Sequence, residues 1–330
     1  MEAEIAVVDV GGLASGDARA VERVAARIEA PSRACGVFHV TGHGIPPASL
    51  EAFDAAMRAL FALPRDVKQS VRRTRTNAWG YYDQELTKNR PDWKEIFDFG
   101  PERSPGAPHH SDGVNQWPAG QDAIRRALLR HHAACEALGR ALLSALCVSL
   151  GLAPDRLDAC FQDGSSFLRL NHYPACPDPA GADAAPLPER GRLGVHPHSD
   201  AGALTLLYQD GVAGLQIEHG DGFALVAPVA GALTVNLGDM LRVWSNDRYR
   251  SPVHRVLARS DRDRYSAPFF LNPRYDTVCE PLLEGPHRDD APRFRPVSWA
   301  RFRDQRSAGD YADQGAEIQV DDFRCGSLVN

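Results

Sequence analysis

The second half of the chain is a succession of short strand-like runs, and this pattern constrains the fold more than any other feature. Aromatic and branched apolar residues cluster in segments separated by Gly, Asp, Asn or Pro turns. The segments read FLRLNHYP, LGVHPHSD, ALTLLYQD, LQIEHGDGFALV, LTVNLGDML, VHRVLA and RYSAPFF. Many short strands at close spacing predict a sandwich or a barrel.

The first half has a different period and predicts helices around two short strands. IAVVDV and GVFHVTGHG are the expected strands, and apolar residues recur every three or four positions in the segments between and after them. These helices cover residues 17–35, 47–63 and about 121–150, and a last helix is expected around 297–309. Residues 101–120, rich in Pro, Gly, Ser and His, predict a loop.

These patterns together predict an α+β fold: a jelly-roll core, or double-stranded β-helix, with N-terminal helices and a C-terminal helix. The 330 residues suit a single domain. We expect a mainly helical part over 1–160, the jelly-roll core over 161–280 and a C-terminal segment over 281–330.

The charge and the cysteine content indicate which classes of partner and which cellular location to expect. The net charge of −6 argues against nucleic acid and anionic membranes as partners. No apolar run approaches the roughly 18 residues of a membrane helix, and the N-terminus does not resemble a signal peptide. The seven cysteines include no CxxC pair, which favours reduced thiols. We therefore expect a cytoplasmic monomer that acts on a small molecule.

His198 and Asp200 are the first candidate metal ligands. Side chains two residues apart on a strand lie on the same face, so a His-x-Asp pair presents two ligands together. A distant histidine on an adjacent strand, His254, would complete one face of an octahedral metal site. Three remaining open positions suit ferrous iron that must also bind a co-substrate and O2.

The His-x-Asp pattern alone is a weak signal, because it occurs four times. His110/Asp112 and His287/Asp289 lie in loop-like segments rich in Pro and charge, and His219/Asp221 lies in an expected hairpin turn. Only His198 lies between strand-like runs.

Arg264 and Ser266 follow His254 and indicate a second binding function. They are two residues apart and share a strand face, and a charged RSDRD turn is expected to pair their strand with that of His254. A guanidinium group beside a hydroxyl suits the far carboxylate of a small dicarboxylic acid.

At these residues the chain resembles a known family. HPHSDAGALTLL, NDRYRSPVHRV and RYSAPFFLNP resemble the core motifs of the iron(II)/2-oxoglutarate-dependent dioxygenases of the isopenicillin N synthase-like group, which includes anthocyanidin synthase, flavonol synthase and gibberellin oxidase. The resemblance extends over nearly the whole chain, through GVFHVTGHGIP and DWKEIFDFG. LRLNHYPAC departs from the family's Asn-Tyr-Tyr-Pro element because His172 replaces the first Tyr.

The resemblance implies a set of roles for these residues. Iron(II) is bound by His198, Asp200 and His254, and the C5 carboxylate of 2-oxoglutarate by Arg264 and Ser266, with Tyr173 and Asn171 near its C1 end. The implied reaction uses O2, releases succinate and CO2, and hydroxylates, desaturates or cyclises a small molecule, with ascorbate as an accessory reductant. We expect a role in bacterial specialised metabolism.

Three further residues are candidates for contact with the substrate. Arg169, Asn171 and Tyr173 are spaced two residues apart, so on a strand their side chains share one face, and Arg169 should face the barrel interior with the other two. There it could bind a substrate carboxylate or form a structural ion pair. Phe270 shares a face with Ser266, and Tyr81 matches a substrate-side position in the family; core packing is the alternative for both.

Two other functions stay open. An iron oxidase of the same fold that does not consume 2-oxoglutarate, or an ethylene-forming type, would retain the same Arg-x-Ser pair. A jelly-roll protein that binds a ligand without catalysis would not require the metal.

Overall fold

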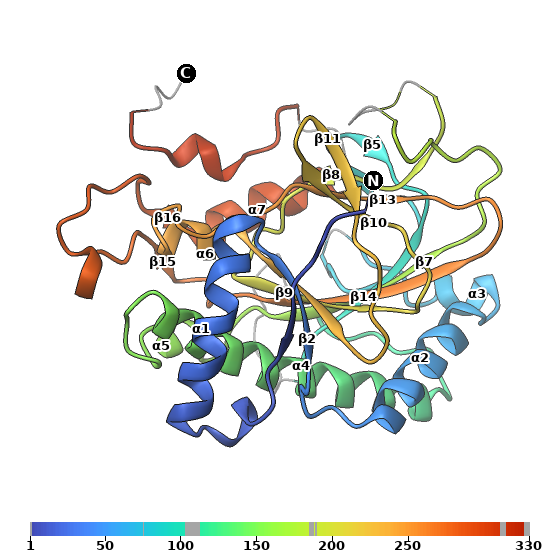
Figure 1. Ribbon diagram of the computed structural model, residues 1–330. Coiled ribbons are helices and arrows are strands. Elements are labelled where there is room, and N and C mark those ends of the chain that lie inside the picture. The colour runs from blue at the N-terminus through green and yellow to red at the C-terminus, as the bar shows by residue number, and fades with distance from the viewer. Residues whose placement is uncertain are drawn as a thin grey trace.

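Two β-sheets lie opposite each other and form the centre of the molecule (Figure 1). The computed structural model describes residues 2–74, 76–102, 113–184, 188, 190–310 and 315–326. In order across the larger sheet, the strands are β1 (Val7–Asp9), β2 (Val37–Thr41), β12 (Leu233–Leu237), β9 (Leu204–Gln209), β14 (Arg264–Leu271), β7 (Phe167–Tyr173), β6 (Glu95–Phe99) and β3 (Gly80–Tyr82). The smaller sheet has the order β11 (Gly222–Leu225), β10 (Leu215–His219), β13 (His254–Leu257) and β8 (Leu193–His198).

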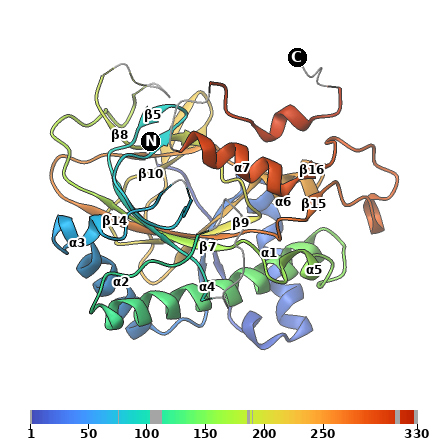
Figure 2. The ribbon, with the colours of Figure 1, turned by 180° about the vertical axis from the view of Figure 1, so that it is seen from behind.

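Helices cover the face of the larger sheet that points away from the smaller one. The long α4 (Asp122–Ser149) packs against β9 and β14, and both α1 (Ala18–Ala34) and α2 (Pro47–Phe61) pack against α4. Figure 2 shows α7 (Trp299–Gly309) on the opposite side of the sheets from α4. The short helices are α3 (Arg65–Gln69), α5 (Asp158–Phe161) and α6 (Asp239–Trp244), with 3-10 turns at Leu13–Ser15, Gly285–His287 and Val320–Phe323.

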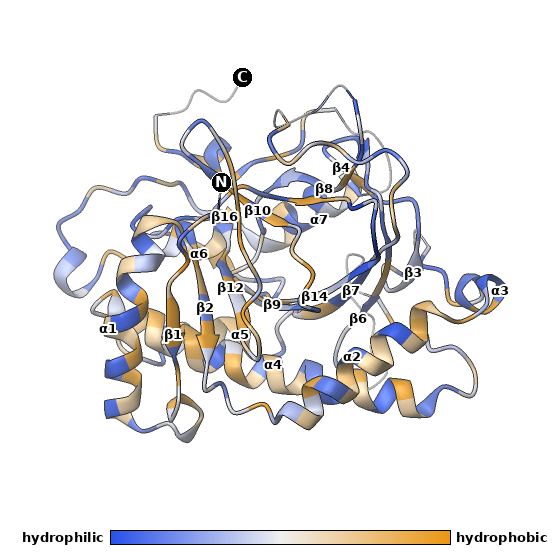
Figure 3. Ribbon diagram, turned by 45° about the vertical axis from the view of Figure 1, so that its right-hand side comes forward, coloured by the Kyte–Doolittle hydropathy of each residue, from blue (hydrophilic) through white to orange (hydrophobic). Residues whose placement is uncertain are grey.

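Apolar periodicity explains this layering. Helix α1 begins where Asp17 accepts a hydrogen bond from the Arg19 N–H, and it buries Val24 and Ile28 while its charged face stays in solvent (Figure 3). The main core lies between the helices and the larger sheet. A second, smaller apolar cluster, which includes Leu207, Leu215 and Val256, lies between the two sheets.

The α+β prediction is confirmed, since a large mixed sheet is combined with helices; β1 and β2 are parallel and the other pairs antiparallel. The predicted helices and the main strand runs are present near their expected positions. The first half holds more strands than expected, because 80–82 and 95–99 extend the larger sheet and β4 (Leu86–Thr87) pairs with β5 (Arg90–Pro91). In LTVNLGDML the strand ends at Leu237, and α6 follows from Asp239. A last pair joins β15 (Val278–Cys279) to β16 (Val297–Ser298).

The predicted hairpin between the strands of His254 and Arg264 is wrong. Both edges of β13 are occupied, by β10 on one side and β8 on the other. The chain therefore crosses to the larger sheet, where β14 pairs with β7 and β9. His254 and Arg264 consequently lie on opposite sheets rather than on neighbouring strands.

Within the described residues, none of the helices combines the length and apolar character that crossing a membrane would require.

Candidate active site

Two imidazoles and one carboxylate converge at one end of the smaller sheet. His198 ends β8, His254 begins β13, and the antiparallel register places them directly opposite each other. Their ring centroids are 4.3 Å apart. Asp200 Oδ1 lies 3.9 Å from His198 Nε2 and 3.6 Å from His254 Nε2. Among the described residues these three, called the triad below, form the one His/Cys/Asp/Glu cluster close enough to hold a metal ion.

Backbone carbonyl groups fix the imidazole tautomers. His198 Nδ1 donates to the carbonyl of His196 at 2.8 Å, and His254 Nδ1 donates to that of Pro252 at 3.2 Å. A carbonyl oxygen only accepts, so the proton is on Nδ1 and the Nε2 lone pair of each ring faces the carboxylate. Burial, and then the adjacent His254, lower the pKa of His198 well below its usual value. The neutral imidazole that results is the form that binds metals.

The triad carboxylate is oriented by strand β9, and the backbone of Asp200 is held by the first residue of α6. Thr205 Oγ1 donates to Asp200 Oδ2 at 2.7 Å, which leaves Oδ1 facing the imidazoles. The Asp200 carbonyl accepts a hydrogen bond from the Asp239 N–H at 2.8 Å. A Cβ added at Gly238 would lie 2.3 Å from the Gly202 carbonyl oxygen, so this close approach of two backbones requires glycine. The carboxylate is therefore held in place before any metal binds.

Replacing Thr205 by valine should weaken iron binding without removing a ligand. The valine keeps the shape of the side chain but leaves Oδ2 of Asp200 without its donor, and loss of such an orienting bond typically costs about 10- to 100-fold in metal affinity. Anaerobic equilibrium dialysis with Fe(II) measures the change. Thr205→Ser, which keeps the hydroxyl, is the matched control and should bind like the original chain; equal binding by the valine variant would contradict the orienting role.

The donor set of the triad fits ferrous iron. Two imidazole nitrogens and one carboxylate oxygen form the facial arrangement typical of non-haem iron(II) oxygenases. The two other His-x-Asp pairs with described residues do not form such a cluster. His219 and Asp221 are exposed at the β10–β11 turn, and Asp289 is exposed after the turn at Gly285–His287. His110 and Asp112 lie outside the described residues.

A cavity with an empty volume of about 510 Å³ extends from the triad between the two sheets. Arg264 lines it from β14 and is only 1% exposed. Its guanidinium group donates to Ser266 Oγ at 3.3 Å, Gln209 Oε1 at 3.0 Å and the Val212 carbonyl at 3.1 Å. Among the described residues no carboxylate pairs with this buried cation, which makes it a candidate group for binding an anionic ligand.

Further polar groups line the same cavity. The ring centroid of Tyr173 lies 5.0 Å from Cζ of Arg264, with the guanidinium group over the ring. Asn171 Oδ1 and Asn236 Oδ1 are buried without a hydrogen-bond partner, so each is free to interact with a ligand or water. Asn236, Thr205 and Gln209 were not among the predicted site residues, because alternation along a strand does not reveal which polar side chain faces a cavity.

The three candidate substrate contacts differ in position. Arg169 lines the cavity as its parity predicts, but its guanidinium group pairs with Asp98 at 2.8 Å and Glu85 at 2.8 Å. Phe270 lines the cavity beside the Phe167 ring, 4.8 Å away. Tyr81 is 3% exposed, donates a hydrogen bond to Glu95 and does not line the cavity, so the structure does not bring it to the triad.

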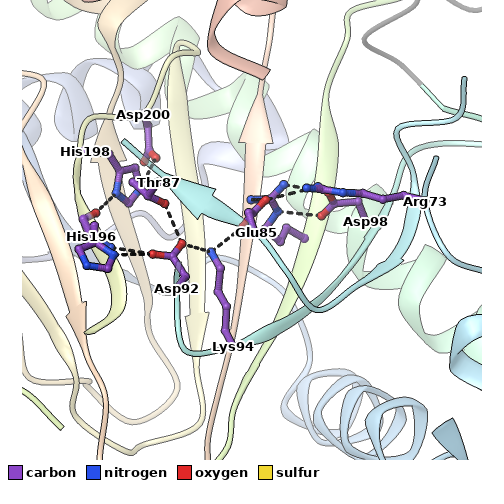
Figure 4. Close-up of polar contacts among 10 residues, drawn as sticks. Arg73, Glu85, Thr87, Asp92, Lys94, Asp98, His196, His198 and Asp200 are labelled. Carbon is purple, nitrogen blue, oxygen red and sulfur yellow. Dashed lines mark hydrogen bonds and ion pairs between the residues drawn. The ribbon is translucent and has the colours of Figure 1, made fainter. Parts of the chain in front are cut away.

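A chain of buried charged groups connects the triad to Arg169 on strand β7 of the larger sheet (Figure 4). Lys94 Nζ lies 2.7 Å from Glu85 Oε2 and 3.3 Å from Asp92 Oδ2. Asp92 Oδ1 accepts hydrogen bonds from the N–H and the Nδ1 of His196. Since the His196 carbonyl holds His198, these charges support the orientation of one triad imidazole.

Two family models match the chain. The 2OG-Fe(II) oxygenase superfamily matches residues 164–273, and the model described as non-haem dioxygenase in morphine synthesis N-terminal matches residues 5–120. Jasmonate-induced oxygenase 2 of Arabidopsis thaliana is 30% identical over 304 residues, 91% of this chain and 78% of that protein. Gibberellin 20 oxidase 2 of Oryza sativa subsp. indica is 33% identical over 313 residues, 94% and 78% of the two chains.

Solved structures are similar over the same extent. JOX2 in complex with 2OG, Fe and JA has a TM-score of 0.79 at 27% identity, covering 98% of this chain and 90% of the other. The dioxygenase for auxin oxidation in rice has a TM-score of 0.71 at 27% identity, and the match covers 98% of this chain and 100% of the other.

Proposed function

Since the chain belongs to the 2OG-Fe(II) oxygenase superfamily and is an iron(II)- and 2-oxoglutarate-dependent dioxygenase, we propose that the triad binds the iron and Arg264 binds the 2-oxoglutarate. The observation that carries this assignment is the placement of both groups on one cavity. The Nε2 atoms of His198 and His254 face the Asp200 carboxylate at one end, and on the opposite sheet lies a buried guanidinium group that has no carboxylate partner among the described residues.

Each group then has a defined task. His198, Asp200 and His254 would hold the iron(II), and a set of three protein ligands would leave positions for 2-oxoglutarate and O2. Arg264, with the Ser266 hydroxyl, would bind the far carboxylate of 2-oxoglutarate. Tyr173 pairs with Arg264 across the two strands and its ring lies 5.0 Å from the guanidinium group, so it would lie beside this far carboxylate and not at the keto-acid end that the sequence suggested; Asn171 stays the proposed contact nearer that end. Bound iron(II) supplies the redox chemistry with O2. The chain itself supplies orientation and a cavity with apolar walls at Leu207, Leu215 and Val256.

We further propose that the enzyme hydroxylates, desaturates or cyclises a small molecule and releases succinate and CO2. Phe270 and Arg169 border the triad on the side of the larger sheet and are proposed to contact that molecule. JOX2 was solved in complex with JA, and gibberellin 20 oxidase is named for a small molecule, which supports this substrate size. The arginine-rich composition, with lysine only at positions 68, 88 and 94, supports a bacterial source and a role in specialised metabolism.

The two opposed sheets are proposed to form a double-stranded β-helix, with one domain over the whole chain. The cavity between the sheets and the triad at its end support this assignment, since both sheets contribute side chains to it. A cytoplasmic monomer with reduced cysteines remains the proposed state; the described cysteines are all free.

Loading the protein with Fe(II) anaerobically and then adding 2-oxoglutarate and O2 tests the proposed function. We expect slow succinate release even without a second substrate, and none when iron, 2-oxoglutarate or O2 is omitted. Succinate is measured by chromatography, with the headspace sampled for ethylene in the same reaction. O2 uptake that does not depend on 2-oxoglutarate, or ethylene in place of succinate, would contradict the proposal.

A further inference from the structure

A second cavity opens on the other side of the triad and is suited to the substrate. Its empty volume is about 750 Å³, and it shares Lys94, Arg169, His198, Asp200 and Phe270 with the first. Helix α7 and the β4–β5 hairpin provide the remaining walls. Since His198 and Asp200 line this cavity as well, a molecule bound here lies next to the proposed iron.

Most charges on these walls are already neutralised within the chain. Arg169 pairs with Asp98 and Glu85, as described above, and Lys94 pairs with Glu85. Arg306 Nε lies 2.8 Å from Glu317 Oε1. An anion entering the cavity would therefore gain little from these cations, and this includes Arg169, the cation that the sequence suggested for the task.

Lys88 and Arg303 are the exceptions, since neither forms an ion pair with a described residue. Lys88 lines the cavity and is half-buried, and no described residue forms an ion pair or hydrogen bond with its ammonium group. Partial burial lowers the pKa of this group, with Glu317 opposing and Arg306 adding to the effect. A partly desolvated cation without a fixed counter-charge next to a binding cavity is a candidate ligand-binding group.

The backbone holds Lys88 in this position. Lys88 and Asn89 form the two-residue turn between β4 and β5, with φ values of 48° and 63°. Such turns favour Asn-Gly, so a lysine at the first position adopts a conformation that its side chain disfavours. Asn89 Nδ2 donates to the Gly315 carbonyl at 2.9 Å, and the Leu86 N–H donates to that of Asp310 at 3.2 Å. These bonds fix the turn over the cavity.

The facing wall is aromatic. Phe167 and Phe270 form a ring pair, and the Arg303 guanidinium group lies 5.1 Å from the Phe167 ring. Asp310 lines the same wall, where burial and then the nearby Glu85 raise its pKa to about 6; Arg303 acts in the opposite direction. Arg303 has no ion pair among the described residues, but its guanidinium group lies over the Phe167 ring, whereas the Lys88 ammonium group has no direct contact of this kind with a described residue.

We propose that Lys88 binds a carboxylate of the substrate, whose apolar body lies against Phe167 and Phe270. A single ammonium group suits a monoanion, because a phosphate dianion would require several more donors. This inference rests on the proposed function and identifies the substrate class of the same site: a small carboxylic acid with an apolar or aromatic body.

The presence of only three lysines in the chain makes the test specific. Protein labelled with carbon-13 at the lysine ε position, loaded anaerobically with Fe(II) and 2-oxoglutarate, should give three side-chain NMR signals. Lys88→Arg identifies the signal of residue 88. Jasmonate, 3-phenylpropionate and indole-3-acetate are the probes, each compared with its methyl ester.

We expect at least one acid to shift the Lys88 signal while its ester does not. Lys88→Met should weaken binding of that acid by about 10- to 100-fold, the range for a hydrogen bond to a charged group, and Lys88→Arg should restore most of it. Arg65→Met, which removes an 82% exposed surface charge, is the matched control.

Equal binding of acid and ester, unchanged binding by Lys88→Met, or no shift of the Lys88 signal with any probe would overturn the inference. The measurement requires no turnover. Failure here in a protein that converts 2-oxoglutarate to succinate would therefore reject the role of Lys88 alone, whereas absence of succinate would reject the proposed function.

Discussion

Replacing Asp200 by alanine is expected to abolish both iron binding and 2-oxoglutarate turnover. The substitution removes the only anionic ligand of the triad, and loss of a residue that merely orients a ligand already costs about 10- to 100-fold in metal affinity. We therefore expect affinity for Fe(II) to fall by more than about 100-fold. Anaerobic equilibrium dialysis and the succinate assay measure the two effects.

The fold should survive this change. Asp200 Oδ1 faces the imidazoles of His198 and His254 and no arginine or lysine among the described residues, so its removal breaks no ion pair with a permanently charged side chain there. Asp221→Ala is the matched control, because it alters another His-x-Asp pair in an exposed turn. The melting temperature of both variants should stay close to that of the original chain without metal. Retention of one tightly bound iron by Asp200→Ala would show that the metal lies elsewhere.

The second large effect is expected at Arg264. Replacing it by glutamine removes the buried positive charge that is proposed to hold 2-oxoglutarate, and truncating one partner of a buried, hydrogen-bonded charge pair costs about 2–5 kcal/mol. At about 1.4 kcal/mol for each factor of ten, the KM for 2-oxoglutarate should rise by about 30-fold or more. Initial rates of succinate release as a function of 2-oxoglutarate concentration give this value.

Iron binding separates this effect from a general loss of structure. Arg264 lies on the larger sheet and makes none of the contacts that hold the triad, so the Arg264→Gln variant should bind Fe(II) normally. Arg262→Gln, two residues away and 63% exposed, is the control that should leave the KM unchanged. An unchanged KM in Arg264→Gln, or simultaneous loss of iron, would contradict the assigned role.

Local pattern predicted the main helices and strand runs, but it missed the short strands of the first half and helix α6. Alternation along one strand was expected to bring His198 and Asp200 together, yet β8 ends at His198 and Asp200 lies beyond it. The second histidine, His254, lies opposite His198 in the register between β8 and β13. The pattern could not specify which sheet each strand joins. His254 and Arg264 are ten residues apart in the sequence, yet they lie on opposite sheets because both edges of β13 are occupied.

The sequence also could not predict which charged residues pair when they lie far apart in the chain. Parity correctly placed Arg169 at the cavity, but its partners Asp98 and Glu85 come from the segment around β6, far earlier in the chain. Lys88 gave no signal in the sequence, because a lysine next to an asparagine is typical of an exposed loop. Its proposed role rests on the turn conformation and on the pairing of most other cations that line the same cavity.

Anaerobic titration of the iron-loaded protein with 2-oxoglutarate, followed by visible absorption, tests the central claim most directly. Chelation of the triad-bound iron by the keto-acid end should produce a charge-transfer band that saturates at one equivalent per chain. The band should require both components, be absent in Asp200→Ala and need a higher concentration of 2-oxoglutarate in Arg264→Gln. A protein that binds one iron but develops no band with saturating 2-oxoglutarate would contradict the account.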